Sequence, residues 1–160
     1  MPDTTTLRGI EQGRADYAYK SAKEGKDTQS ENPIDGILFH SKNYKALVKK
    51  VPMMVKTNGL GATFAFLLSK RAKDKEVNRQ KIQPGQPGGN AKNAHDLVYQ
   101  QTAEWIKSKY PFTGDFSDFI ITQESTQYRA ITNEIISFFT WLRRFAEGLI
   151  EGEDDGNDNP

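Results

Sequence analysis

The sequence predicts an all-α protein, a compact single-domain bundle of five or six helices. The chain has 160 residues, a length that suits one domain with a substantial core. No stretch alternates apolar and polar residues between turn signals, as a strand would, whereas apolar residues recur at helical spacing. We therefore assign residues 1–150 to the bundle, with residues 74–93 as a flexible linker between helices, and residues 151–160 to a disordered acidic tail.

The first helix is expected from about Thr4 to Glu24. Asp3 or Thr4 can cap its N-terminus, because a short polar side chain accepts a hydrogen bond from the first free amides. Gly25 is expected to stop the helix, since glycine readily adopts the left-handed conformation found at helix ends. Residues 25–41 then read as a polar loop with turn signals.

The second helix is expected to begin near Ser41 and to end at Asn58-Gly59. Pro52 lies inside it, and its missing backbone donor and bulky ring predict a kink or a break into two pieces. The third helix, from about Leu60 to Lys73, is apolar nearly all round, which predicts a place at the centre of the bundle. The apolar stripe of the second helix consists of Tyr44, Leu47, Val48, Val51 and Val55.

Three more helices are expected after the linker. Asn90 or Asn93 caps the fourth, which runs to about Lys109 with Ala94, Leu97, Val98, Trp105 and Ile106 facing inward. A short helix spans Asp115 to Thr122, where Asp115 and Asp118 suit the first turn. The last and longest helix runs from about Ser125 to Ile150. Its inward stripe comprises Tyr128, Ile131, Ile135, Phe138, Phe139, Leu142, Phe145 and Leu149.

The composition excludes several kinds of chemistry. Without cysteine there is no disulfide, thiolate metal site or cysteine nucleophile. No apolar run reaches the roughly 20 residues of a membrane helix, and the N-terminus lacks the regions of a signal peptide, so a cytoplasmic protein is expected. His40 and His95 lack partners at zinc-binding spacing. These residues therefore point to no catalytic residue and no metal site, although an enzyme is not excluded by them.

The Gly59-Leu60-Gly61 segment begins like a dinucleotide fingerprint but lacks its third glycine and the preceding strand. We interpret Gly59 as a helix end and Gly61 as a position of close packing. The alternative is weak anion attraction by the helix N-terminus beside Lys56.

Basic residues are concentrated in one part of the chain. The last ten residues hold five acids and no bases, which leaves 22 basic against 16 acidic residues in the rest. On a helical wheel, Lys42, Lys45, Lys49 and Lys56 share a strip opposite the apolar stripe, about 21 Å long. Such a strip is either a solvated face or a face that binds a polyanion. Trp141 lies off the main stripe of the last helix, so it either packs on another helix or contacts a partner.

Several segments resemble a known family. Pro52-Met53-Met54-Val55-Lys56-Thr57-Asn58-Gly59-Leu60-Gly61-Ala62 leads into Phe64-Ala65-Phe66-Leu67-Leu68-Ser69-Lys70. Tyr128-Arg129-Ala130-Ile131 and the segment from Phe138 through Trp141-Leu142-Arg143-Arg144-Phe145 to Leu149 follow. Together they resemble the small α-helical subunit of the type III-B (Cmr, RAMP-module) CRISPR effector complex, an antiviral defence assembly.

The resemblance implies a helical bundle that is not an enzyme and that has no cofactor and no small-molecule substrate. It implies that copies stack along the complex with other subunits and line the groove where target RNA pairs with the guide. It implies RNA contact through basic residues on the groove side. The candidate RNA-binding residues are Lys56, Lys70, Arg71, Arg143 and Arg144, joined by Lys42, Lys45 and Lys49 from the wheel.

Alternative functions remain open on the sequence alone. A helical DNA-binding regulator could use the turn at Asn58-Gly59 as part of a helix-turn-helix, although the helix after it is almost wholly apolar. An enzyme could be built from scattered polar residues. A small subunit of a related type III complex would share the same physics.

Overall fold

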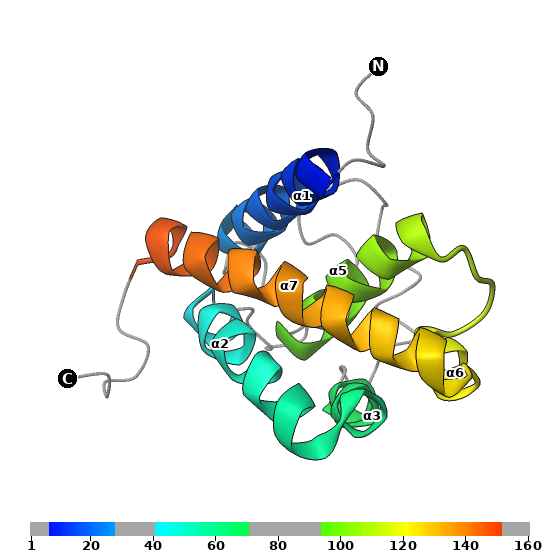
Figure 1. Ribbon diagram of the computed structural model, residues 1–160. Coiled ribbons are helices and arrows are strands. Elements are labelled where there is room, and N and C mark those ends of the chain that lie inside the picture. The colour runs from blue at the N-terminus through cyan, green and yellow to red at the C-terminus, as the bar shows by residue number, and fades with distance from the viewer. Residues whose placement is uncertain (1–6, 28–40, 71–93, 152–160) are drawn as a thin grey trace.

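The computed structural model of the chain describes residues 7–27, 41–70 and 94–151, and this part contains six helices and no strand (Figure 1). The all-α prediction is confirmed. No helix in these residues is long and apolar enough to cross a membrane. The helices are α1 (Leu7–Asp27), α2 (Ser41–Asn58), α3 (Leu60–Lys70), α5 (Ala94–Lys109), α6 (Phe116–Ile121) and α7 (Ser125–Leu149).

Helix α7 is the longest of the described helices and has three of the others packed against it. It packs against α1, α2 and α5, while α3 packs against α2, α5 and α6 (Figure 1). The apolar residues of α7 recur every three or four positions, so one face of the helix is continuously apolar and is buried. Buried on this face are Ile131, Ile135, Phe138, Phe139, Leu142 and Ala146.

The predicted core residues of α2 and α5 are likewise buried. Tyr44, Leu47, Val48, Val51 and Val55 of α2 meet Ala94, Leu97, Val98, Trp105 and Ile106 of α5 in one cluster. Burying a large apolar side chain stabilises the fold by roughly 1.5–3 kcal/mol. The stripes seen in the sequence therefore supply most of the core.

A buried polar network joins three helices at the centre. The Tyr44 hydroxyl of α2 donates to Gln101 Oε1 of α5 at 2.6 Å. Gln101 Nε2 donates to the Ser21 carbonyl of α1 at 2.9 Å and to Glu24 Oε1 at 2.9 Å. Burial, with the nearby charge of Glu24, raises the pKa of Tyr44 well above its usual value. The hydroxyl is therefore a neutral donor, and the network fixes α1 against α2 and α5.

The prediction that Gly25 stops the first helix is wrong, because α1 continues to Asp27. The expected start at Thr4, with Asp3 or Thr4 as cap, lies outside the described residues. Gly25 is buried, and a Cβ there would overlap the Tyr44 ring. The glycine thus allows close approach of α1 and α2.

Of the two outcomes predicted at Pro52, a kink or a break, the break does not occur. Helix α2 is uninterrupted from Ser41 to Asn58, with Pro52 inside it. Packing of α2 against α5 and α7 compensates for the one backbone hydrogen bond that proline removes.

Helix α3 lies at the edge of the bundle and not at its centre (Figure 1). Leu60, Thr63, Phe64 and Leu67 are buried, but Ala62, Ala65 and Phe66 on the opposite side are exposed. Only α2, α5 and α6 of the described helices pack extensively against it, so within the described part of the chain its broad apolar surface is covered on one side.

The later boundaries agree with the sequence. Asp115 caps α6 by accepting a hydrogen bond from the Ser117 amide at 2.9 Å, and α7 ends at Leu149 with Ile150 as its C-cap. The proposed linker, residues 74–93, and most of the acidic tail, residues 152–160, lie outside the described residues.

Candidate nucleic-acid interface

The turn between α2 and α3 is fixed by Gly59 and Gly61. Gly59 has φ of 93°, a conformation that favours glycine. The Gly61 amide donates to the Tyr128 hydroxyl of α7 at 2.8 Å, and that hydroxyl lies 3.4 Å from where a Cβ at Gly61 would stand. Both glycines have the roles that the sequence predicted. Because Tyr128 occupies the Gly61 amide, the anion-binding alternative loses this donor.

The predicted lysine strip of α2 is only partly on the surface. Lys42 and Lys56 are exposed, and Lys49 is partly exposed. Lys45 is buried, with 8% of the residue exposed, and its ammonium donates to the Ile150 carbonyl at 3.0 Å. The end of α7 covers the stem of Lys45, and the ammonium satisfies a carbonyl at the helix end. The wheel prediction that Lys45 lies on an exposed strip is therefore wrong.

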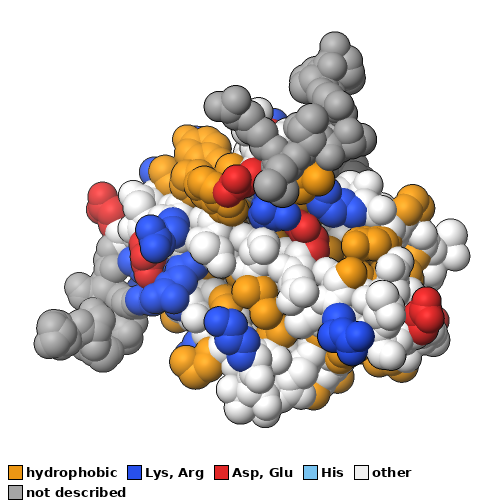
Figure 2. Space-filling view, viewed as in Figure 1, with side chains coloured by type: hydrophobic (Ala, Val, Ile, Leu, Met, Phe, Trp, Pro, Cys, Tyr) orange, Lys and Arg blue, Asp and Glu red, His pale blue; other side chains and the backbone are white. Residues whose placement is uncertain are grey.

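Glu147 brings the basic residues of α2 and α7 together. Its Oε2 lies 3.9 Å from Lys49 Nζ and 3.3 Å from Arg143 Nε. Arg144 is the next residue of α7 and is exposed. Basic and acidic side chains lie side by side over the C-terminal end of α7 (Figure 2). Lys49 and Arg143, two of the predicted RNA-binding residues, therefore lie close together although they are about a hundred residues apart in the chain.

Arg129 is a further basic residue of this surface that sequence reasoning did not select. It is exposed on α7, eighteen residues before Glu147. At 3.6 residues per turn, that separation is five full turns, so both side chains leave the same side of the helix. We give the name α2–α7 basic face to six exposed or partly exposed cations of the two helices: Lys42, Lys49, Lys56, Arg129, Arg143 and Arg144.

Lys70 belongs to a different group. Its ammonium lies 5.8 Å from the centre of the Phe66 ring, and Phe66 meets the His95 ring edge-to-face at 6.0 Å. Burial, followed by the charges of Lys70 and Lys50, lowers the pKa of His95 below its usual value. Lys70 therefore lies towards α5 and away from α7. Arg71 lies outside the described residues.

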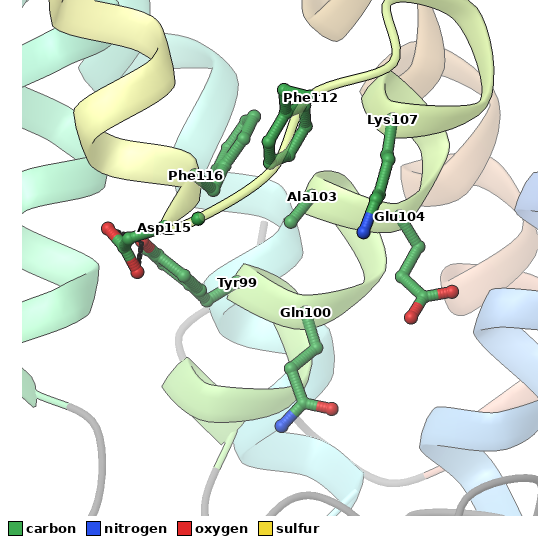
Figure 3. Close-up of a pocket in the computed structure, with 9 residues that line it drawn as sticks. Tyr99, Gln100, Ala103, Glu104, Lys107, Phe112, Asp115 and Phe116 are labelled. Carbon is green, nitrogen blue, oxygen red and sulfur yellow. Dashed lines mark hydrogen bonds between the residues drawn. The ribbon is translucent and has the colours of Figure 1, made fainter.

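A hollow of about 180 Å³ lies between α5 and the start of α6 (Figure 3). Tyr99, Phe112 and Phe116 give it an aromatic lining, and the Lys107 ammonium lies 5.6 Å from the Phe112 ring centre. The Tyr99 hydroxyl bonds Asp115 and Ser117, and burial raises its pKa. This hydroxyl stays protonated at neutral pH and hydrogen-bonds the residues that begin α6.

Within the ranges given above, no three His, Cys, Asp or Glu side chains are placed to hold a metal ion.

Two comparisons with known proteins show what this chain is similar to. The family model described as CRISPR-associated protein (Cas_Cmr5) matches residues 10–149, which span every described helix apart from the first residues of α1. The crystal structure of a CRISPR-associated Cmr5 family protein from Thermus thermophilus has a similar fold, with a TM-score of 0.59 and 22% sequence identity. That match covers 88% of this chain and 96% of the other.

Proposed function

The chain belongs to the Cmr5 family of CRISPR-associated proteins, components of the Cmr complex, and we propose that within this complex it is a non-catalytic structural subunit that holds RNA by its phosphates. The proposed partners are other subunits, further copies of this chain, and guide or target RNA, all in the cytoplasm. The observation that carries the proposal is the α2–α7 basic face.

The basic face has the dimensions of a phosphate-binding surface. Lys42, Lys49 and Lys56 follow one another at seven-residue intervals, about 10 Å apart along α2. Arg129 and Arg143 are separated by about 21 Å along α7. Cations at this spacing can contact several phosphates of one strand, which fixes a strand in place without reading its sequence.

The ion pairs of Glu147 do not cancel this charge. Two cations share one carboxylate, and the three side chains are between 31% and 50% exposed. Exposed ion pairs of this kind contribute only about 0–1 kcal/mol. A phosphate can therefore replace the carboxylate as a partner at little cost, while Glu147 keeps Lys49 and Arg143 oriented in its absence.

Charge reversal tests the proposal. The triple variant Lys49→Glu, Arg143→Glu, Arg144→Glu should weaken binding of single-stranded RNA by the Cmr complex. For single strands, the log–log dependence of affinity on salt has a slope of about −0.7 per phosphate contact. Fluorescence anisotropy over a salt series should therefore give a shallower slope for the variant, to a similar extent for RNAs of different sequence.

The matched control is Lys20→Glu, Lys23→Glu on α1. Both lysines are exposed and each pairs with an aspartate of its own helix, so the control reverses two charges away from the basic face, against three in the test variant. Equal affinity and equal salt slope for the triple variant and the wild type would refute the proposal.

Incubation of the chain with labelled RNA and divalent metal adds a second test, because specific cleavage would contradict a non-catalytic role.

The alternatives are less well supported. For a DNA-binding regulator, α3 would have to enter a groove. The first two turns of its exposed side carry Ala62, Ala65 and Phe66, which offer base edges no hydrogen bonds, and Ser69 and Lys70 follow only at its C-terminal end. A small subunit of a related type III complex is disfavoured by the match to the Cmr5 family model.

A further inference from the structure

Three aromatic side chains lie together where α1 meets α7. The Trp141 ring stacks on Phe145 with centroids 5.8 Å apart and planes 23° apart. Phe145 in turn meets Tyr19 of α1 edge-to-face at 5.4 Å. Tyr19 is 41% exposed, and Trp141 and Phe145 are half-buried. Figure 2 shows hydrophobic side chains gathered over this junction, with basic side chains beside them.

A hollow of about 300 Å³ adjoins this aromatic group. Among the described residues, its lining comprises Glu11, Gln12 and Ala15 of α1 and Trp141 of α7. One face of Trp141 is covered by Phe145, and the indole also borders the hollow. The hollow therefore combines a flat aromatic wall with a carboxylate and a carboxamide.

Arg144 connects the hollow to the basic face. It follows Trp141 by three residues and precedes Glu147 by three. Residues three apart are neighbours on a helix surface, so Arg144 lies between the aromatic group and the Lys49–Glu147–Arg143 ion pairs. A strand whose phosphates contact Arg143 and Arg144 would bring its bases to Trp141.

We propose that Trp141 is a stacking platform for an unpaired RNA base, which enters the hollow between α1 and α7 while the basic face holds the flanking phosphates. This inference rests on the proposed function. Stacking on aromatic side chains beside a cationic track is how single strands are held without strict sequence preference. Charge complementarity with the adjoining basic face favours RNA over an apolar protein segment as the occupant.

Glu11 gives the hollow a mild base preference. A carboxylate can only accept hydrogen bonds at neutral pH, and adenine and cytosine carry exocyclic amino groups that donate. Uracil carries no amino group, and its one donor on the pairing edge, the N3 imino group, lies between two carbonyl oxygens that Glu11 repels. We therefore expect oligoadenylate and oligocytidylate to bind more tightly than oligouridylate.

The test compares Trp141→Leu with Trp141→Phe in the full chain, using short single-stranded oligoadenylate, oligocytidylate and oligouridylate at low salt. Leucine retains apolar packing on Phe145 without stacking on a base, so Trp141→Leu should bind oligoadenylate roughly tenfold more weakly. The salt slope should not change, because no phosphate contact is lost. Trp141→Phe should retain most of the affinity.

Tryptophan fluorescence provides a readout that does not depend on affinity. The chain has two tryptophans, and Trp105 is buried. Oligoadenylate should quench the emission of the wild type, and Trp141→Phe should abolish the quenching. Glu11→Gln should reduce the preference for oligoadenylate over oligouridylate.

Unchanged affinity in Trp141→Leu, or quenching that persists in Trp141→Phe, would overturn the inference. So would a Trp141→Leu variant that binds oligoadenylate normally but fails to join the Cmr complex, since Trp141 would then contact a protein. If the triple charge reversal weakens RNA binding and Trp141→Leu does not, only the stacking fails. If neither changes binding, the proposed function fails as well.

Discussion

Gly25 shows how the absence of one side chain fixes the packing of two helices. The sequence offers only a glycine after an amphipathic segment, which is the usual sign of a helix end. In the structure the residue lies inside α1, where the Tyr44 ring occupies the space of a Cβ. The partner ring is nineteen residues further along the chain, so local pattern could not identify this role.

The change Gly25→Ala should therefore destabilise the protein by about 1–3 kcal/mol, because the added methyl group must displace Tyr44. The matched control is Gly13→Ala in the same helix, where no atom lies within 4 Å of the new Cβ. There the helix propensity of alanine should stabilise the fold by up to about 1 kcal/mol. Urea unfolding measures both, and a stabilising Gly25→Ala would contradict the packing seen here.

Glu134 is a carboxylate on which three helices converge. It accepts from Arg14 Nε and Nη2, each at 2.9 Å, and from Trp105 Nε1 at 2.7 Å, so that α1, α5 and α7 share one anchor. Burial alone would raise the pKa of Glu134, but the hydrogen bonds from Arg14 and Trp105 lower it below its usual value.

Because the pKa of Glu134 is lower in the folded than in the unfolded chain, its ionised form stabilises the fold above the unfolded pKa of about 4.3. This contribution is lost as the pH falls through the folded pKa. Glu134→Gln should cost about 2 kcal/mol at neutral pH and should reduce the loss of stability on acidification. The control is Glu147→Gln at an exposed ion pair, and equal effects of both variants on urea unfolding would contradict this account.

At the scale of helices, the hydrophobic period predicted the number and most boundaries of the elements, because each helix buries a face that recurs at 3.6 residues. The hydrophobic period could not show whether another helix covers the residues outside the main apolar stripe of each helix. Helix α3 has apolar residues on several sides, yet only one side is covered. Lys45 appears beside exposed lysines on a wheel, yet the end of α7 closes over it.

The Lys45 contact gives a prediction for the seam between α2 and α7. Lys45→Met keeps the apolar stem but leaves the Ile150 carbonyl without this donor, so it should destabilise the fold by about 1 kcal/mol. Because the ammonium is turned to the Ile150 carbonyl, the salt slope of RNA binding should not change. Lys49→Met should behave in the opposite way, with little effect on urea unfolding and a slope shallower by about 0.7. A shallower slope for Lys45→Met would restore Lys45 to the RNA-binding set.

At the scale of the whole molecule, charge is uneven along the sequence, because an acidic segment follows the helix that carries three cations of the basic face. The formal net charge of +1 would become +5 without residues 152–160, which contain four acids. Helix α7 ends at Leu149, two residues after the Glu147 that pairs with Lys49 and Arg143. The sequence revealed the basic residues and the acidic C-terminal segment, but only the fold shows that α7 ends beside Lys49 and Arg143.

Removing residues 152–160 should therefore strengthen RNA binding severalfold at low salt, because the loss of four negative charges raises the net charge of the chain and its attraction for phosphates. The gain should shrink as salt rises, since the screening length falls to about 10 Å at 0.1 M ionic strength and about 3 Å at 1 M. A full-length variant with these four acids changed to asparagine or glutamine should bind like the truncated chain, which separates charge from length. Anisotropy over a salt series measures all three proteins, and a truncated chain that binds no more tightly than the wild type at the lowest salt would show that the RNA lies away from the end of α7.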